Sequence, residues 1–199
     1  MRKLSQTLVL IFCLVAYTGY GQPGLTAQTM IPDSAKKISL TSLKGFNTVF
    51  PISKSPLSVI VFLSPECPLC RNYSKTLNEL SKEFAGKVQF IGIVPGKAYS
   101  SKEINHFIKE YSLRMNVFID PSKKFSRSLK ASVTPEVIVA DNKGIIYYRG
   151  AIDDWMTALG KKKEKPSIFY LKNALAQVVN KQPVILSSTK PVGCYINDY

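Results

Sequence analysis

Apolar residues show two kinds of spacing along this chain, one typical of strands and one typical of helices. Residues 57–63 form a nearly unbroken β-branched and apolar run, which predicts a central strand buried on both faces. After this run, apolar residues recur every three or four positions until Gly86 and predict a helix. These residues are Tyr73, Leu77, Leu80 and Phe84. A strand over 88–94 then completes a parallel pair with a right-handed crossover.

The same spacings predict further helices and strands before and after this strand–helix–strand unit. Upstream, apolar positions around Lys44-Gly45 indicate a small hairpin within 38–50. Downstream, we expect a helix capped by Ser101, a strand over 116–119 and a short helix over 122–131. A Gly-containing turn between 137–140 and 145–148 predicts an antiparallel hairpin. Residues 153–165 read as a loop before a last helix, whose apolar positions are Ile168, Leu171, Leu175 and Val178.

The first residues have the pattern of a secretory signal. Arg2 and Lys3 precede an apolar run over 8–16, and small residues follow before Gln22. We therefore divide the chain into a signal peptide (1–21), an N-terminal tether (22–36), one domain (37–182) and a C-terminal tail (183–199). The apolar run is too short to span a bilayer comfortably, so we expect no transmembrane segment once the signal is removed. The mature protein is expected in the periplasm or outside the cell.

Composition and charge fit one soluble domain. The chain has 199 residues, 45% hydrophobic and 20% charged, with a net charge of +14. The lysines are spread widely and are not gathered with aromatic residues, so the pattern does not favour nucleic acid as a partner. A solvated basic surface is the simplest interpretation. We expect the chain to act as a monomer.

The cysteines carry the most specific chemistry. Cys67 and Cys70 stand where the strand over 57–63 gives way to the next helix. A sulfur at a helix start lies near free backbone N–H groups, which favour its ionised, reactive form. Cys70 lies one turn into the helix and is expected to be shielded, which leaves Cys67 as the exposed nucleophile. Loss of the signal peptide would leave Cys194 as the third, unpaired cysteine of an exported protein.

The order of these elements, with Cys67-Pro68-Leu69-Cys70 and Val133-Thr134-Pro135-Glu136, resembles the thioredoxin superfamily. The closer resemblance is to secreted redoxins related to the alkyl-hydroperoxide-reductase and thiol-specific-antioxidant group. It implies a three-layer α/β fold with a central mixed sheet, helices on both faces and an extra helix and strand, here within 101–119. It also implies that Pro135 is cis and faces the thiols, and that the Thr134 backbone binds an extended substrate peptide.

The resemblance implies thiol–disulfide exchange on substrate proteins, with Cys67 attacking and Cys70 resolving. A redox partner protein would then recycle the pair, and we expect no cofactor. Cys194 follows Gly193 in a Gly-Cys motif that many such redoxins share, which implies a relay thiol. Glu66 and Pro68 flank Cys67 and are candidate tuning residues. Where thioredoxins bury an aspartate, this chain has Val61, which leaves water or another carboxylate to move protons.

Three other interpretations of the cysteine pair stay open. A zinc site would need Cys194 and His106, the one histidine, as further ligands, and these do not form a paired motif; we expect no metal. Thiol peroxidases have a proline and a threonine ahead of the reactive cysteine, where this chain has Ile60 and Ser64, and Arg149 is a candidate charge near a thiolate. A non-catalytic peptide-binding module would use the pair as a structural disulfide.

Overall fold

The computed structural model describes residues 29–51 and 55–196. The predicted signal peptide (1–21) and the first part of the predicted tether lie outside these residues. In the part of the chain that the structure describes, no helix is long and apolar enough to cross a membrane.

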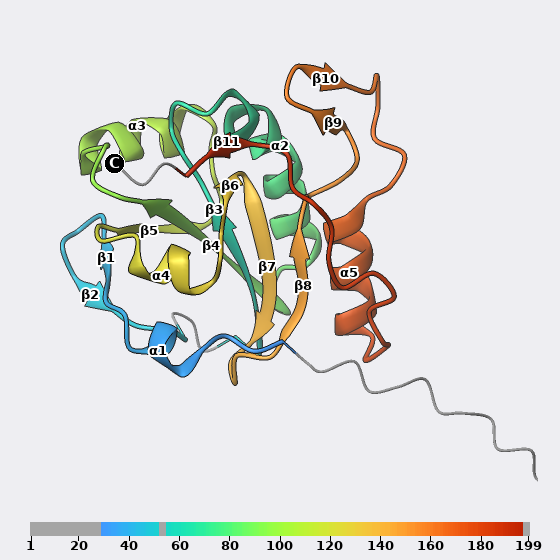
Figure 1. Cartoon of the computed structure of the whole chain (residues 1–199), viewed down its shortest axis with the longest axis horizontal. Helices are drawn as coiled ribbons and strands as arrows, with labels where there is room; N and C mark the ends of the chain where they lie inside the picture. Colours follow the sequence, from blue (N-terminus) through green and yellow to red (C-terminus); the bar gives the residue numbers. More distant parts are fainter. Residues whose placement is uncertain (1–28, 52–54, 197–199) are drawn as a thin grey trace, which may run out of the picture.

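A mixed sheet of seven strands forms the centre of the molecule (Figure 1). Its strand order is β2-β1-β5-β4-β3-β7-β8. Strands β3, β4 and β5 are parallel to their neighbours in this group, and the other pairs are antiparallel. The strands span β1 (Leu40–Ser42), β2 (Asn47–Thr48), β3 (Leu57–Phe62), β4 (Val88–Pro95), β5 (Asn116–Asp120), β7 (Glu136–Asp141) and β8 (Ile146–Gly150). Because β3 lies between β4 and β7, the predicted central strand is confirmed.

Helices cover both faces of the sheet, and β3 shows why. Its residues Val59 and Val61 point into one core cluster with α2, α3 and α5, while Ile60 and Phe62 point into a second cluster with α1 and α4. Alternate side chains of a strand point to opposite faces, so a strand that is apolar throughout needs a cover on each. The helices span α1 (Asp33–Lys36), α2 (Pro68–Glu83), α3 (Ser101–Glu110), α4 (Lys124–Ser128) and α5 (Tyr170–Val179). The three-layer α/β fold with an extra helix and strand, α3 and β5, is confirmed.

The tether prediction is wrong for residues 29–36. Ile31 is only 1% exposed and its N–H donates to Gly144 O, while Ile146 N–H donates to Thr29 O. Ala35 of α1 is fully buried in the second core cluster. The segment packs against the domain because its apolar residues cover the sheet face of the second core cluster. These residues show no periodicity, so the sequence did not predict this packing.

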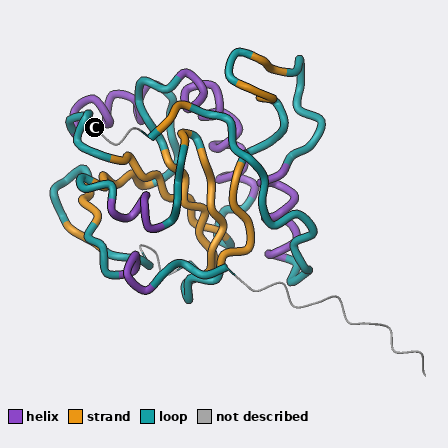
Figure 2. Tube along the Cα trace, viewed as in Figure 1, coloured by secondary structure: helices purple, strands orange, loops and turns teal. Residues whose placement is uncertain are grey.

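The stretch predicted as a loop before the last helix contains a small hairpin. Strands β9 (Met156–Ala158) and β10 (Lys161–Lys162) pair antiparallel and form a separate two-stranded sheet. Figure 2 shows this hairpin projecting from the body of the molecule between loops. Two shorter corrections concern helix ends: the cap of α3 is Ser100 rather than Ser101, and Ile168 lies before α5 and is exposed.

The C-terminal tail is part of the fold. After α5 it runs back along the molecule to β11 (Cys194–Tyr195), which pairs antiparallel with β6 (Val133–Thr134) in a third sheet (Figure 1). This pairing brings the tail to the end of the central sheet at which the cysteine pair lies.

Candidate active site

Cys67 is the N-cap of α2, and residues 63–66 connect it to the carboxyl end of β3. Its backbone is extended (φ −71°, ψ 115°), and Pro68 begins the helix. Proline suits this position because the first helical N–H groups have no partner inside the helix. The sequence prediction of a thiol at a helix start is therefore confirmed, and Cys70 lies one turn further into the helix.

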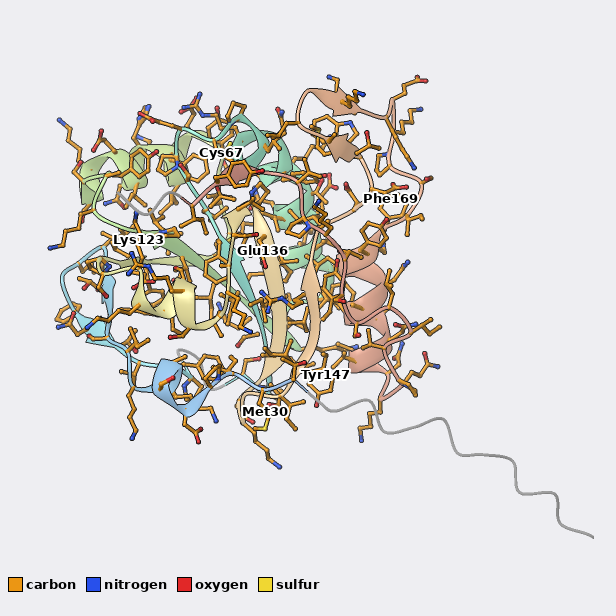
Figure 3. All side chains as sticks on the ribbon, in the orientation of Figure 1. Met30, Cys67, Lys123, Glu136, Tyr147 and Phe169 are labelled. Carbon is orange, nitrogen blue, oxygen red and sulfur yellow. The ribbon has the colours of Figure 1, made fainter. Side chains whose placement is uncertain are left out.

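The loop before β7 faces the cysteine pair. The Thr134–Pro135 bond is cis, as the resemblance implied. In its protonated form the Cys67 thiol donates a hydrogen bond to the carbonyl oxygen of Thr134, and Sγ and O lie 3.0 Å apart. The structure thus brings together Cys67, Cys70, Thr134 and Pro135, and Figure 3 places Cys67 at the end of the sheet above Glu136.

Cys67 is not exposed, which corrects the sequence prediction. Its residue is 2% exposed, and Cys70 is fully buried as expected. Cys67 belongs to the first core cluster, and Cys194 of the tail packs against that cluster. Cys67, Cys70 and Cys194 are all free thiols in this structure.

The three thiols differ in acidity. A hydrogen bond from Cys70 is the main cause that lowers the pKa of Cys67 to about 4; burial opposes it and a hydrogen bond from Cys194 assists it. Burial is the main cause that raises the pKa of Cys70 well above its usual range, and the neighbouring Cys67 sulfur adds to it. Burial and Cys67 likewise raise the pKa of Cys194 to about 12. One negative charge is therefore held on Cys67, with the other two sulfurs as proton donors.

The residues beside Cys67 form a small polar group. The Tyr99 hydroxyl lies 3.0 Å from Ser64 Oγ and donates to Glu66 Oε2 at 3.3 Å. Glu66 is exposed, so its carboxylate contacts both Tyr99 and solvent next to Cys67. Sequence reasoning missed Tyr99, because no motif marks it and it comes from the loop after β4.

Glu136 is a buried carboxylate directly after Pro135. It is 2% exposed and accepts hydrogen bonds from Ser132 N at 2.9 Å and Arg149 Nη2 at 3.1 Å. The Arg149 guanidinium also donates to Leu129 O at 2.8 Å. Arg149 therefore anchors the loop before Pro135, which fixes the position of the Thr134 carbonyl. The sequence signal for the Glu136–Arg149 pair was the position of an acidic residue, Glu136, at the start of the apolar run of β7.

The other sequence candidates lie apart from this group. His106 is on the exposed side of α3 with Nε2 3.6 Å from Glu110. Within residues 29–51 and 55–196, no three His, Cys, Asp or Glu side chains are arranged to hold a metal ion. Ile60 belongs to the core cluster on the sheet face opposite that of the cysteines. Ser64 contacts Tyr99 as described above.

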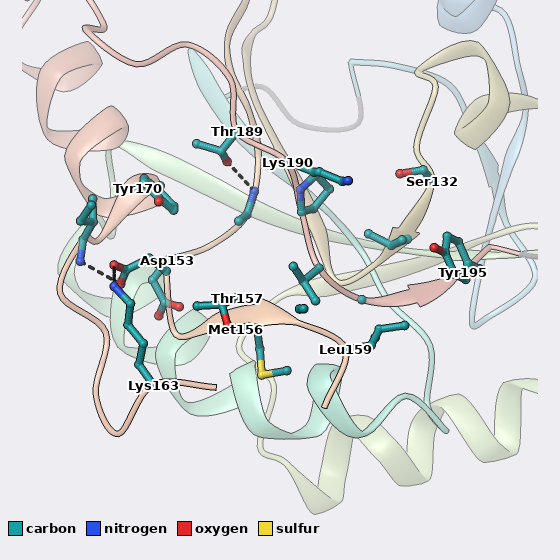
Figure 4. Close-up of a pocket in the computed structure, with 18 residues that line it drawn as sticks. Ser132, Asp153, Met156, Thr157, Leu159, Lys163, Tyr170, Thr189, Lys190 and Tyr195 are labelled. Carbon is teal, nitrogen blue, oxygen red and sulfur yellow. Dashed lines mark hydrogen bonds and ion pairs between the residues drawn. The ribbon is translucent and has the colours of Figure 1, made fainter. Parts of the chain in front are cut away.

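Grooves lie on both sides of β11. One, of about 920 Å³, runs between the tail and the β9–β10 hairpin and is lined by Val133, Gly193 and Tyr195 among others (Figure 4). The other, of about 400 Å³, is lined by Leu63, Thr134, Cys194 and Tyr195 among others. Tyr195 of the tail lines both grooves.

Comparisons with known proteins agree with this geometry. Residues 28–149 match the sequence model of the AhpC/TSA family. The chain is 24% identical over 147 residues to the thioredoxin-like protein YneN of Bacillus subtilis, which covers 69% of this chain and 84% of that relative.

Solved structures share the fold. A hypothetical protein from Sinorhizobium meliloti superposes with a TM-score of 0.73 at 20% identity, covering 87% of this chain and 94% of that chain. A secreted Mycobacterium tuberculosis disulfide oxidoreductase homologous to E. coli DsbE superposes with a TM-score of 0.53 at 16% identity, covering 75% and 99%. At these identities the likeness shows the thioredoxin-like fold.

Proposed function

The chain belongs to the AhpC/TSA family and is a thioredoxin-like redoxin; from this premise we propose that it catalyses thiol–disulfide exchange on protein substrates through Cys67 and Cys70. The observation that carries the proposal is the position of the Cys67 sulfur. Cys67 is the N-cap residue of α2, its thiol has a pKa of about 4, and its sulfur lies 3.0 Å from the carbonyl oxygen of Thr134, next to Pro135. A thiolate held beside a strand edge can react with a disulfide carried on an extended peptide that pairs with that edge.

The exchange proceeds in two displacements. The Cys67 thiolate attacks one sulfur of a substrate disulfide, so that a Cys67–substrate bond forms and the other substrate sulfur leaves with the electron pair and takes up a proton. Cys70 then loses its proton and attacks Cys67 Sγ, which releases the second substrate sulfur and leaves a Cys67–Cys70 disulfide. The raised pKa of Cys70 keeps it protonated while Cys67 carries the charge. Read in reverse, the same steps oxidise a substrate dithiol.

Reduction of insulin disulfides in the presence of dithiothreitol tests the proposal. We expect the parent to accelerate precipitation of the insulin B chain, and Cys67→Ser to lose this acceleration completely. Cys70→Ser would retain the first displacement but could not form the Cys67–Cys70 disulfide, so its rate would fall below that of the parent. His106→Gln, on the exposed side of α3, is the matched control and would match the parent. Equal rates for the parent and Cys67→Ser would contradict the proposal.

Peroxidase chemistry is less well supported by the site. The Arg149 guanidinium binds Glu136 and two backbone carbonyls, and Ile60 stands where peroxidases have a proline. Hydrogen peroxide would then oxidise Cys67 to sulfenic acid slowly. Rapid, stoichiometric sulfenic acid formation at Cys67 would favour the peroxidase instead.

We further propose that the protein is exported and acts as a monomer on substrate proteins, recycled by a separate redox partner. The basic residues and apolar run of 1–21 support the export proposal. N-terminal sequencing of the protein from cell fractions tests it: a mature chain that begins near Gln22 outside the cytoplasm is expected, and an intact Met1 in the cytoplasm would contradict it.

A further inference from the structure

The C-terminal tail occupies the strand edge beside Pro135. Cys194 pairs with Thr134 and Tyr195 with Val133 in antiparallel register. Ile196 N donates to Ser132 O at 3.0 Å, and Thr134 Oγ1 donates to Cys194 O at 3.5 Å. An extended substrate peptide would use the same backbone groups of β6. The tail and a substrate strand therefore compete for one edge.

Two glycines allow the tail to lie this close. A Cβ on Gly193 would come within 2.4 Å of Thr134 O, and a Cβ on Gly150 would come within 2.3 Å of Thr189 O. Real Cβ atoms do not approach backbone oxygens at such distances, so any side chain at either position would move the tail. The docked tail therefore depends on glycine at both positions.

The tail is held firmly at its start and loosely near its end. The Thr189 hydroxyl lies 2.6 Å from the Tyr148 hydroxyl and accepts from Ala151 N at 2.9 Å, and the Arg149 backbone bonds with Ser187 and Thr189. Beyond this anchor, Tyr195 is 72% exposed and grooves open on both sides of β11. We therefore expect residues 194–196 to separate from β6 more readily than Thr189 separates from its partners.

The register places a thiol against a thiol. Cys194 pairs with Thr134, whose carbonyl oxygen lies 3.0 Å from Cys67 Sγ, and Cys194 packs against the core cluster that contains Cys67. A substrate cysteine would need this same position to react. Building on the proposed function, we propose that residues 188–196 are an internal substrate strand, that Cys194 forms an exchangeable disulfide with Cys67, and that external substrates must displace this strand.

The exchange is balanced within the chain. In the oxidised protein the Cys194 thiolate attacks Cys67 Sγ; the Cys67–Cys194 bond forms as the Cys67–Cys70 bond breaks, and the electron pair leaves on Cys70, which takes up the proton that Cys194 released. The reverse step restores the Cys67–Cys70 disulfide. No outside oxidant or reductant is needed, because one disulfide and one thiol are present on each side. The strand thus moves the disulfide to the accessible end of the tail.

Glutathione disulfide acting on the full-length Cys70→Ser variant tests this inference, because only Cys67 and Cys194 then remain in the described chain. Cys67 first forms a mixed disulfide with glutathione; attack by Cys194 then forms the Cys67–Cys194 bond and releases reduced glutathione. Intact mass and peptide mapping would show this internal disulfide as the main product. A Cys67–glutathione adduct that persists beside a free Cys194 would overturn the inference.

Two variants in the Cys70→Ser background test whether the Cys194 thiol reacts because the tail is docked on β6 or only because the thiol is present. Gly193→Ala and Ile196→Pro, which removes the N–H donated to Ser132, would each lower the ratio of internal disulfide to glutathione adduct about tenfold. Ile185→Ala, at an exposed position earlier in the tail, is the control and would keep the ratio. Ile196→Pro removes a backbone hydrogen bond that lies outside the central sheet, so it tests docking even where Gly193→Ala impairs folding. Ratios that are unchanged in both variants would overturn the inference.

The insulin assay separates this inference from the proposed function. If the parent reduces insulin but Cys194 stays free in its Cys70→Ser variant, the internal-strand inference is contradicted and the proposed function stands. If the Cys70→Ser variant forms the Cys67–Cys194 disulfide but the parent does not reduce insulin, the internal-strand inference is supported. Only the proposed action on protein substrates is then contradicted.

Discussion

Cys67 Sγ lies 3.0 Å from the carbonyl oxygen of Thr134, although 67 residues separate the two in the chain. The contact joins the start of α2 to the loop before β7, and thus joins the reactive sulfur to the strand edge that would hold a substrate. Sequence alone offers Cys67 and Thr134 as separate motifs. Their contact makes them one site.

The acidity of Cys67 gives the first prediction. With a pKa of about 4, Cys67 is ionised throughout the range from pH 5.5 to 8.5, so its alkylation by iodoacetamide would change little across that range. An ordinary thiol, with a pKa of about 8.5, would gain nearly tenfold in rate for each pH unit below its pKa. Peptide mapping of the fully reduced protein at several pH values measures the rate at Cys67.

Cys70→Ala supplies the matched control for this pH profile. It removes the hydrogen bond that is the main cause of the low pKa, so the pKa of Cys67 would rise and its alkylation would become dependent on pH. A parent profile that climbs tenfold per pH unit would contradict the assignment of the charge to Cys67.

The same pKa shift makes the stability of the reduced protein depend on pH. The pKa of Cys67 is lower in the folded state than in the unfolded chain, so the unfolded state binds more protons between the two values. The stabilisation is full above the unfolded pKa and is lost as the pH falls towards 4. From pH 5 to 8, the free energy of unfolding would therefore rise by at most about 1.4 kcal/mol per pH unit relative to Cys67→Ser.

Urea unfolding at pH 5, 6.5 and 8 under reducing conditions measures this difference. The other titrating groups are common to the parent and Cys67→Ser, so their contributions cancel in the comparison. Parallel stability curves for the two proteins would show that Cys67 carries no charge in the folded state.

The Glu136–Arg149 pair is predicted to support the loop before Pro135. Removing one partner of a buried ion pair leaves an uncompensated charge, so Arg149→Met would lower the free energy of unfolding by about 3 kcal/mol. The double variant Glu136→Gln with Arg149→Met removes both charges and would recover part of that loss. Chemical unfolding of the parent, both single variants and the double variant measures the coupling. A double variant less stable by the sum of the two single losses would contradict the pairing.

Tyr73 is predicted to stabilise a buried carboxylate. Its hydroxyl donates to Asp153 Oδ1 at 2.6 Å, and burial raises the pKa of Asp153 while this hydrogen bond lowers it. Tyr73→Phe would cost about 1–2 kcal/mol of unfolding free energy. Tyr147→Phe is the matched control, since its hydroxyl lies 3.4 Å from Asp141 and the residue is only half-buried. Equal losses in the two variants would contradict a special role for Tyr73.

The parts of the fold that the sequence predicts are those with a long, regular pattern. The run over 57–63 is long and uniformly apolar, so its burial between β4 and β7 follows directly. The apolar face that begins near Tyr73 likewise defines α2. The position of Cys67 at the end of this strand and the start of this helix could therefore be predicted.

The features that the sequence did not predict depend on short segments and distant contacts. Strand β11 has two residues and pairs with β6 some sixty positions earlier, too short for any periodicity to show. Cys194 of this strand packs against the core cluster that contains Cys67, and no pattern in the sequence indicates this, so the prediction of an exposed thiol was wrong. In the same way, Ile31 and Ala35 have no repeating pattern around them, and only the assembled sheet shows that they are covered.

A redox titration of the Cys67–Cys70 pair tests the central claim most directly. The full-length protein is equilibrated in glutathione buffers, and the fraction of Cys67–Cys70 disulfide is measured by acid trapping and peptide mapping. A pair that exchanges with substrates would have a reduction potential between about −120 and −270 mV. A potential below about −300 mV would identify a structural disulfide and contradict an active thiol–disulfide exchange site.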